Sequence, residues 1–189
     1  MDVEMQAAGF VLAGGRSSRM GRDKALLGCG SRPLIEEVAA TLSAAAGSVA
    51  LVGAPERYRG LGFDCLPDLR PGCGPLGGIE AALAAARGEY NAIAACDMPN
   101  VRELWIRALL KKSNETGALC TAACDATGKI HPLCAVYRSG SLPAVRALLD
   151  AGDFRLSSLS QELHAITIDI GEKLWNLNTV ADWEAWLRR

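Results

Sequence analysis

The residues best suited to chemistry in this sequence lie in a glycine-rich, basic stretch near its start, residues 10–24. The apolar run Phe10–Ala13 predicts a short buried strand, which Gly14 and Gly15 interrupt. Glycines let a backbone turn tightly and approach a ligand, while Arg19 and Lys24 supply charge that matches phosphate oxygens. The stretch therefore predicts a nucleoside triphosphate site, although a solvated loop would share its composition. It does not close with Gly-Lys-Ser/Thr, so it is not a P-loop.

A second candidate residue is Asp97, which follows the apolar run Tyr90–Ala95. A carboxylate at the carboxyl end of a buried strand, beside a phosphate-binding loop, is a natural ligand for Mg²⁺. An aspartate in this place is also a common helix cap. Position alone leaves these two interpretations nearly even.

The sequence contains no convincing nucleophile with an activating base. Its two histidines, His131 and His164, form no Ser-His-Asp or Cys-His arrangement that can be assembled from the pattern. An acceptor that is a phosphate monoester has a second pKa near about 6, so it is already ionised at neutral pH. Catalysis would then consist of alignment and charge neutralisation, with no general base.

The elements that must position these residues alternate between apolar strands and helices. In the first half we expect strands at 10–13, 49–52, 63–66 and 90–95, and helices at 33–46, 79–87 and from about 100 to 112. Asn100 and Glu103 have capping-box spacing for the last of these helices. The Gly- and Pro-rich residues 67–78 predict no regular structure. Ligands in such sheets bind beyond the carboxyl ends of the strands, so loops 14–24, 68–78 and 97–100 are expected to meet.

The second half of the chain has a different pattern. Residues 118–124 and 130–137 flank a turn at 125–128 and predict an antiparallel or mixed addition to the sheet. Helices at 142–151 and 157–163, a strand at 164–170 and a last helix capped by Thr179 and Asp182 follow, with Trp183, Trp186 and Leu187 on one face. We therefore expect an α/β fold, a three-layer αβα sandwich with a Rossmann-like, mostly parallel sheet, forming a single domain over residues 1–189.

Composition restricts the partners and the setting. The chain has 189 residues, is 50% hydrophobic and carries a net charge of -1, which supports a real core and argues against nucleic acid as a partner. No apolar run approaches the ~20 residues that cross a bilayer, and the acidic start lacks a secretion signal, so we expect a cytoplasmic protein without a membrane partner. The seven cysteines are an odd number, and Cys96, Cys120 and Cys134 lie in apolar runs, so buried free thiols are expected. Because Cys-x-x-Cys does not occur, we expect no structural zinc.

The first loop, Leu12-Ala13-Gly14-Gly15 with the cations that follow, closely resembles the signature loop of the molybdenum cofactor guanylyltransferase family. That family belongs to the nucleotidyltransferases that activate sugars, pterins and alcohols, with a fold of the nucleotide-diphospho-sugar transferase type. The Leu-Ala-Gly-Gly order resembles the guanylyl branch, since the related cytidylyl enzymes typically carry Ala-Ala-Gly. The resemblance extends to the final helix. It implies GTP and molybdopterin as substrates, Mg²⁺ as cofactor and transient contacts with other molybdenum cofactor proteins.

The resemblance also implies roles for individual residues. Arg19, Lys24 and Asp97 would be catalytic, and Asp97, in Cys96-Asp97-Met98-Pro99, would hold the metal. The residues implied to bind GTP are Leu12, Ala13, Gly14, Gly15, Lys24, Asp68 and Asp97. The residues implied to contact the acceptor are Gly77, Gly78, His131, Asn176 and Asn178.

Several of these residues have structural explanations that are as good without the resemblance. Asp68 could be an ordinary turn residue, His131 a structural histidine, and the two asparagines turn and cap residues. Residues 72–77 are a literal G-x-G-x-x-G, but they do not form the first strand-to-helix turn, so we reject a dinucleotide fingerprint. Where the family often has Asn after the second strand, this chain has Gly53, and a side-chain contact with the nucleotide is lost there.

Three functions therefore remain in view. The first is transfer of GMP from GTP to the terminal phosphate of molybdopterin, with release of pyrophosphate. The second is a related nucleotidyltransferase that uses CTP or a sugar-phosphate acceptor. The third is a protein that binds GTP or the cofactor without catalysis. Nucleotide preference separates the first two, and pyrophosphate release separates both from the third.

Overall fold

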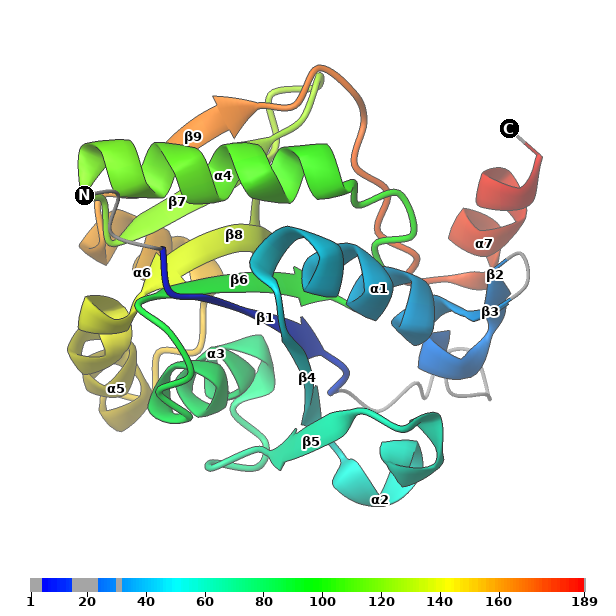
Figure 1. Ribbon diagram of the computed structural model, residues 1–189, viewed down its shortest axis with the longest axis horizontal. Helices are drawn as coiled ribbons and strands as arrows, with labels where there is room; N and C mark the ends of the chain where they lie inside the picture. The colour runs from blue at the N-terminus through cyan, green and yellow to red at the C-terminus, as the bar shows by residue number, and fades with distance from the viewer. Residues whose placement is uncertain (1–4, 15–23, 30–31, 189) are drawn as a thin grey trace.

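The fold is built on one twisted seven-stranded sheet, seen in a computed structural model that describes residues 5–14, 24–29 and 32–188 (Figure 1). The strand order is β5-β4-β1-β6-β8-β7-β9. All of these strands run in one direction except β8, which is antiparallel to both of its neighbours. The strands are β1 (Ala7–Leu12), β4 (Val49–Gly53), β5 (Asp64–Pro67), β6 (Tyr90–Ala95), β7 (Cys120–Cys124), β8 (Ile130–Arg138) and β9 (Ile166–Asp169). The mostly parallel sheet with an antiparallel addition in the second half is confirmed.

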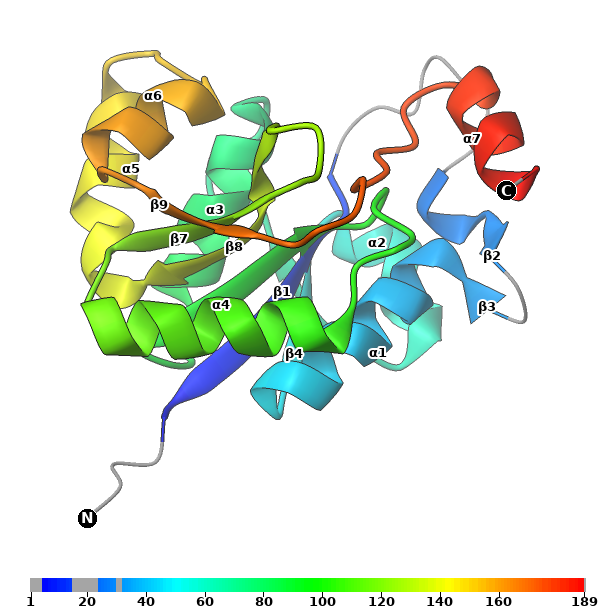
Figure 2. The same cartoon turned by 90° about the horizontal axis from the view of Figure 1, so that it is seen from above.

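Helices cover both faces of this sheet, so the three-layer sandwich is also confirmed (Figures 1 and 2). Helices α1 (Leu34–Ala46) and α4 (Glu103–Thr116) lie on one face, and α3 (Gly74–Ala84), α5 (Leu142–Asp150) and α6 (Leu156–Glu162) lie on the other. Strand residues alternate between the two cores because successive side chains point to opposite faces. In β1, Val11 packs with α1 and α4, whereas Phe10 and Leu12 pack with α3.

Shorter elements complete the fold. They are η1 (Lys24–Leu26), the ribbon β2 (Gly28–Cys29) with β3 (Arg32–Pro33), α2 (Pro55–Tyr58), η2 (Arg59–Leu61), η3 (Ser139–Ser141) and α7 (Val180–Leu187). The predicted capping box of α7 is present, with Thr179 and Asp182 bonded reciprocally. Trp186 is buried against Leu34, whereas Leu187 is 64% exposed.

Two sequence predictions about helix starts are corrected by the structure. Asn100 does not cap α4, whose N-cap position is Arg102 without a side-chain cap. Helix α3 begins at Gly74, inside the stretch expected to lack regular structure, because Pro is well tolerated in a first helical turn. Two of its glycines leave room for close neighbours: a Cβ on Gly77 would lie 3.2 Å from the Arg70 carbonyl oxygen, and one on Gly78 would lie 3.3 Å from Leu12 Cδ2.

The cysteines behave as the sequence predicts where the structure describes them. Six are free thiols, and Cys96, Cys120 and Cys134 are buried. Burial raises the pKa of both Cys120 and Cys134 to about 12, so these thiols stay protonated and unreactive. Within residues 5–14, 24–29 and 32–188, no helix combines the length and the apolar character needed to span a membrane.

Candidate active site

The candidate site lies along the edge of the sheet where the parallel strands end. Strands β1, β4, β5 and β6 run in the same direction, so Gly14, Gly53, Asp68 and Asp97 lie at or just beyond their carboxyl ends, at one edge. A Cβ built on Gly14 would lie 3.7 Å from Asp68 Oδ2, so the first and second loops are in contact. The expected contact between loops 14–24 and 68–78 is therefore confirmed for the part of the first loop that the structure describes, and loop 97–100 follows β6, the strand that pairs with β1.

The path of the first loop is fixed by hydrogen bonds from three directions. The Ala13 amide donates to the Val52 carbonyl at 2.8 Å, and the Cys96 amide donates to the Leu12 carbonyl at 3.0 Å. The hydroxyl of Tyr58, a buried residue of α2, donates to the Ala13 carbonyl at 3.1 Å. Tyr58 is not among the predicted site residues, because nothing in its local sequence pattern links it to Ala13, 45 residues away along the chain. Gly14 is the exposed position at the end of this fixed path.

Gly53 is required by the same close packing. Its φ is +142°, a conformation that L side chains rarely adopt. A Cβ at this position would lie 3.0 Å from both Ala13 C and Gly14 N, and 3.1 Å from Ala13 O. The peptide joining Ala13 and Gly14 thus occupies the space in which a side chain at position 53 would begin. The departure from asparagine has a physical reason in this chain.

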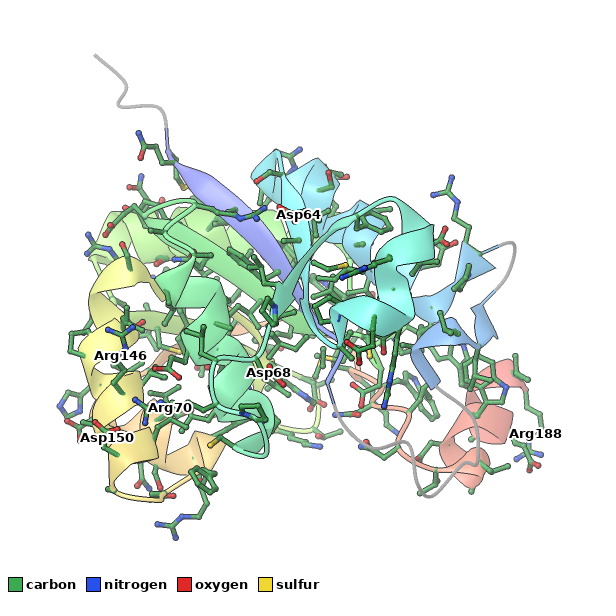
Figure 3. The ribbon with its side chains drawn as sticks, turned by 90° about the horizontal axis from the view of Figure 1, so that it is seen from below. Asp64, Asp68, Arg70, Arg146, Asp150 and Arg188 are labelled. Carbon is green, nitrogen blue, oxygen red and sulfur yellow. The ribbon has the colours of Figure 1, made fainter. Side chains whose placement is uncertain are left out.

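The second loop carries Asp68 and is anchored by a network of ion pairs that begins at Arg70 (Figure 3). Arg70 reaches the buried carboxylate of Glu80, with Nε 3.1 Å from Oε2, and also pairs with Asp150 of α5. Arg146 approaches Glu80 from the other side, 3.2 Å from Nε to Oε1. Glu80 therefore holds two cations from separate elements and fixes the loop against α3 and α5.

The Asp68 carboxyl is the titrating group of this loop that faces the first loop. It is half-buried, and burial raises its pKa above the ordinary value. A carboxylate whose hydration is reduced in this way gains most from hydrogen-bond donors on a ligand. Gly77 and Gly78, by contrast, are buried within α3. Their predicted contact with an acceptor stays a prediction.

Asp97 is 7% exposed and is the second residue after β6. Its backbone carbonyl accepts a hydrogen bond from the Leu177 amide at 2.9 Å. The side-chain amide of Asn176, turned so that its nitrogen faces the carboxylate, lies 2.8 Å from Asp97 Oδ2 and 3.2 Å from Oδ1. Asn178 Nδ2 lies 2.8 Å from the side-chain amide of Asn176, so the structure brings Asn176 to Asp97 and Asn178 to Asn176.

This donor set suits a hard divalent cation. Within the described ranges, no three His, Cys, Asp or Glu side chains cluster into a complete metal cage. Mg²⁺ characteristically takes one or two carboxylates and completes its shell with phosphate oxygens and water. A carboxylate oriented by an amide donor, as Asp97 is by Asn176, fits that pattern.

Asn176 and Asn178 belong to a segment, residues 172–178, that we call the strap. It crosses from β9 to α7 and passes beside the loop between β6 and α4 (Figure 2). Arg102 pairs with Glu172 at 2.7 Å at the start of the strap. Asn100 donates to the Lys173 carbonyl and accepts from the Trp175 amide. Sequence analysis missed this role of Asn100, because its spacing to Glu103 matched a helix cap instead.

His131 lies at the same edge, near the turn between β7 and β8, but its ring faces another protein group. Its Nε2 is 2.8 Å from Asp125 Oδ2. Both residues are buried: His131 is 3% exposed and Asp125 is 4% exposed. Burial raises the pKa of Asp125, but hydrogen bonds from Thr127, His131 and the Lys129 amide outweigh that effect and hold it well below its usual range. The structure shows His131 as the partner of Asp125, and a contact with an acceptor stays a prediction.

Three predicted residues cannot be placed from their side chains. Gly15 and Arg19 lie outside the described residues, and Lys24 contributes only its backbone, at the start of η1. Their roles rest on the sequence. The described groups nonetheless show that the loop leaves β1 at Gly14, between Gly53 and Asp68.

Comparison with known proteins adds a family to this geometry. Residues 9–166 match the model of the MobA-like NTP transferase domain. The molybdenum cofactor guanylyltransferase of Rhodobacter capsulatus is 36% identical over 186 residues, covering 94% of this chain and 93% of that protein. The crystal structure of molybdopterin-guanine dinucleotide biosynthesis protein A from Archaeoglobus fulgidus superimposes with a TM-score of 0.78 at 21% identity, over 94% of this chain and 95% of that one. A Mycobacterium tuberculosis protein solved in complex with manganese gives 0.74 at 20% identity, over 97% and 99%. Both crystal structures are similar to this chain in fold.

Proposed function

Since the chain belongs to the MobA-like NTP transferase family, we propose that it transfers GMP from GTP to the terminal phosphate of molybdopterin. A phosphate oxygen of the acceptor forms a new bond to the α-phosphorus of GTP. The bond between that phosphorus and the oxygen bridging to the β-phosphate breaks, and pyrophosphate leaves with the bonding electron pair. The product is a guanine dinucleotide form of the cofactor.

The observation that carries the proposal is the juxtaposition of Gly14, Asp68 and Asp97 at one edge of the sheet. The backbone at Leu12 and Ala13 is already bonded within the protein, so we assign the guanine-facing backbone groups to Gly14 and the loop beyond it. Asp68 would accept hydrogen bonds from donors of the guanosine. Its reduced hydration favours such donors over bulk water.

Charge neutralisation is assigned to Asp97, Arg19 and Lys24. We propose that Asp97 holds Mg²⁺, in keeping with the manganese complex of the Mycobacterium tuberculosis protein. A bound divalent ion would supply positive charge to the triphosphate and the leaving pyrophosphate. Arg19 and Lys24 would add to that charge from the first loop. The Asn176 amide, with its nitrogen facing Asp97, would help to orient that carboxylate.

The reaction needs no general base, because the attacking phosphate is already ionised near neutral pH. This agrees with the state of His131, whose ring is engaged with a strongly acidic Asp125. The protein therefore aligns two phosphates that would otherwise repel each other. We place this activity in the cytoplasm, since the free thiols of the six described cysteines suit a reducing compartment.

The proposal is tested by titration calorimetry with GTP, CTP, UTP and ATP, each with Mg²⁺ and with Mn²⁺, followed by pyrophosphate release in the presence of molybdopterin. We expect metal-dependent binding of GTP alone and pyrophosphate release only when the acceptor is present. The variant Asp97→Asn should keep the fold and lose the metal dependence. A preference for CTP would assign the protein to cytidylyl transfer, and GTP binding without pyrophosphate release would refute an enzymatic role.

A further inference from the structure

The side chain of Asn100 makes two hydrogen bonds with the backbone of the strap, as the backbone of a neighbouring strand would. Its Nδ2 donates to the Lys173 carbonyl at 2.8 Å, and its Oδ1 accepts from the Trp175 amide at 3.0 Å. One side chain thus satisfies a carbonyl and an amide two residues apart on the strap. A side-chain amide is suited to this because it carries a donor and an acceptor side by side.

The strap continues directly from this clamp to Asp97. One residue beyond Trp175, the amide of Asn176 reaches the Asp97 carboxylate, and the next residue, Leu177, donates its N–H to the Asp97 carbonyl. Both Asn100 and Asp97 belong to the loop between β6 and α4. The loop therefore grips the strap at two points, with Asn176 between them.

Asn100 has no duty in helix α4 that would explain it otherwise. The helix starts at Glu103 after Arg102, with no side-chain cap from either residue or from Asn100. Glu103 instead pairs with Arg107 one turn further on, at 2.6 Å. Replacing Asn100 removes the clamp on the strap and leaves the start of α4 unchanged.

We propose that Asn100 is a positioning residue for the metal carboxylate, acting through the strap to keep the Asn176 amide on Asp97. The inference rests on the proposed metal-binding role of Asp97. Hydrogen-bond partners of a ligating carboxylate fix its orientation, and their loss typically costs about 10–100-fold in metal affinity. Asn100 acts one step further away, so the lower end of that range applies.

The test compares Asn100→Ala with wild type and with Glu103→Gln, a matched control in the same segment that leaves the strap untouched. Hydrogen exchange should be faster at the Leu177 amide in Asn100→Ala and unchanged in the control. The Mn²⁺ concentration that half-saturates GTP binding in calorimetry should rise about tenfold in Asn100→Ala. GTP binding at saturating Mn²⁺ and the unfolding temperature should stay close to wild type.

A double-mutant cycle with Asn176→Ala shows whether Asn100 acts through Asn176. We expect the double variant to require no more Mn²⁺ than Asn176→Ala alone, and additive shifts would overturn the proposal. Asn100→Asp, which keeps an acceptor for the Trp175 amide, is a milder second variant and should speed exchange at Leu177 less than alanine does.

Different outcomes would overturn the metal role of Asp97 and the positioning role of Asn100. Wild-type protein that binds GTP equally well without metal would overturn the metal role of Asp97 and this proposal with it. Wild-type protein that needs metal, together with an Asn100→Ala variant of unchanged metal requirement, would overturn the role of Asn100 alone. Faster hydrogen exchange at the Leu177 amide of Asn100→Ala, without a change in its Mn²⁺ requirement, would likewise overturn the role of Asn100 alone.

Discussion

Replacing Gly53 by alanine should disturb the nucleotide site more than its small size suggests. The new Cβ would lie 3.0 Å from Ala13 C and Gly14 N, whereas carbon atoms are most stable at about 3.5–4.0 Å. Relief of this contact would move the peptide between Ala13 and Gly14 by roughly 0.5 Å. A misplacement of about 1 Å can cost about 100-fold in rate, so we expect kcat/KM for GTP to fall about tenfold.

A matched control separates this displacement from backbone strain. Gly62, in the same connection between β4 and β5, also has a positive φ, +76°, but a Cβ there would meet nothing within 4 Å. Alanine at either position should cost about 1–3 kcal/mol of unfolding free energy through its dihedral angle. Only Gly53→Ala should weaken GTP binding in calorimetry and lower kcat/KM.

Two outcomes would contradict this role of the Ala13–Gly14 peptide. Gly53→Ala with wild-type GTP affinity would show that the Ala13–Gly14 peptide is not part of the nucleotide site. Equal losses of GTP affinity in Gly53→Ala and Gly62→Ala would show that general destabilisation accounts for the effect. The same geometry predicts that Gly53→Asn also weakens GTP binding, because its Cβ meets the same peptide.

Three further changes have definite expected outcomes. Lys24→Ala should lower kcat/KM for GTP by about 100-fold or more, with little change in the unfolding temperature, because its charge serves the triphosphate; near wild-type turnover would contradict the phosphate role of the loop. Tyr58→Phe removes the hydroxyl that holds the Ala13 carbonyl and should raise KM for GTP severalfold while kcat changes little, measured by steady-state kinetics. Asp125→Asn should lower the unfolding free energy most near neutral pH. The low native pKa of Asp125 stabilises the fold above the ordinary value of 3.8, and that gain is lost as the pH falls below it, so the gap between variant and wild type should narrow in acid unfolding experiments. A difference in unfolding free energy between variant and wild type that grows as the pH falls would refute the stabilising role of the Asp125 carboxylate.

The sheet was predictable from the sequence because its strands carry their own signal. The apolar run Tyr90–Ala95 was predicted with the bounds that the structure has. Hydrophobic content on both faces indicates a strand that helices cover from two sides, and local residues alone determine it. The capping box of Thr179 and Asp182 was equally readable, since both partners lie within one helical turn.

The role of Asn100 could not be predicted from local sequence patterns. Its spacing to Glu103 satisfies the same capping pattern as Thr179, yet its amide bonds the strap, 73 and 75 residues further along the chain. Two competing partners were available, and only the tertiary structure decides between them. The roles of Tyr58 and Gly53 could not be predicted for the same reason. Each residue contacts Ala13 from a different element of the fold, and the local sequence does not record that contact.

Helix α3 was mispredicted at its start for a different reason. The composition of residues 67–78 indicates irregular structure, and for Asp68 to Cys73 this is correct. From Gly74 onward, burial against Leu12 and the Arg70 carbonyl favours small residues within a helix. The cost of glycine in a helix is about 1 kcal/mol per residue, which the packing of a buried turn can offset.

The strap also determines when the site becomes complete during synthesis of the chain. Strands β1, β4 and β6 and the loop with Asp97 all precede it in the sequence, so the nucleotide-facing edge can assemble while later residues are still being added. Asp97 gains the Asn176 amide only after β9 has paired with β7 and the strap has crossed the edge. A nascent chain could therefore hold a nucleotide before its metal carboxylate is oriented, and competence for transfer would follow binding in time.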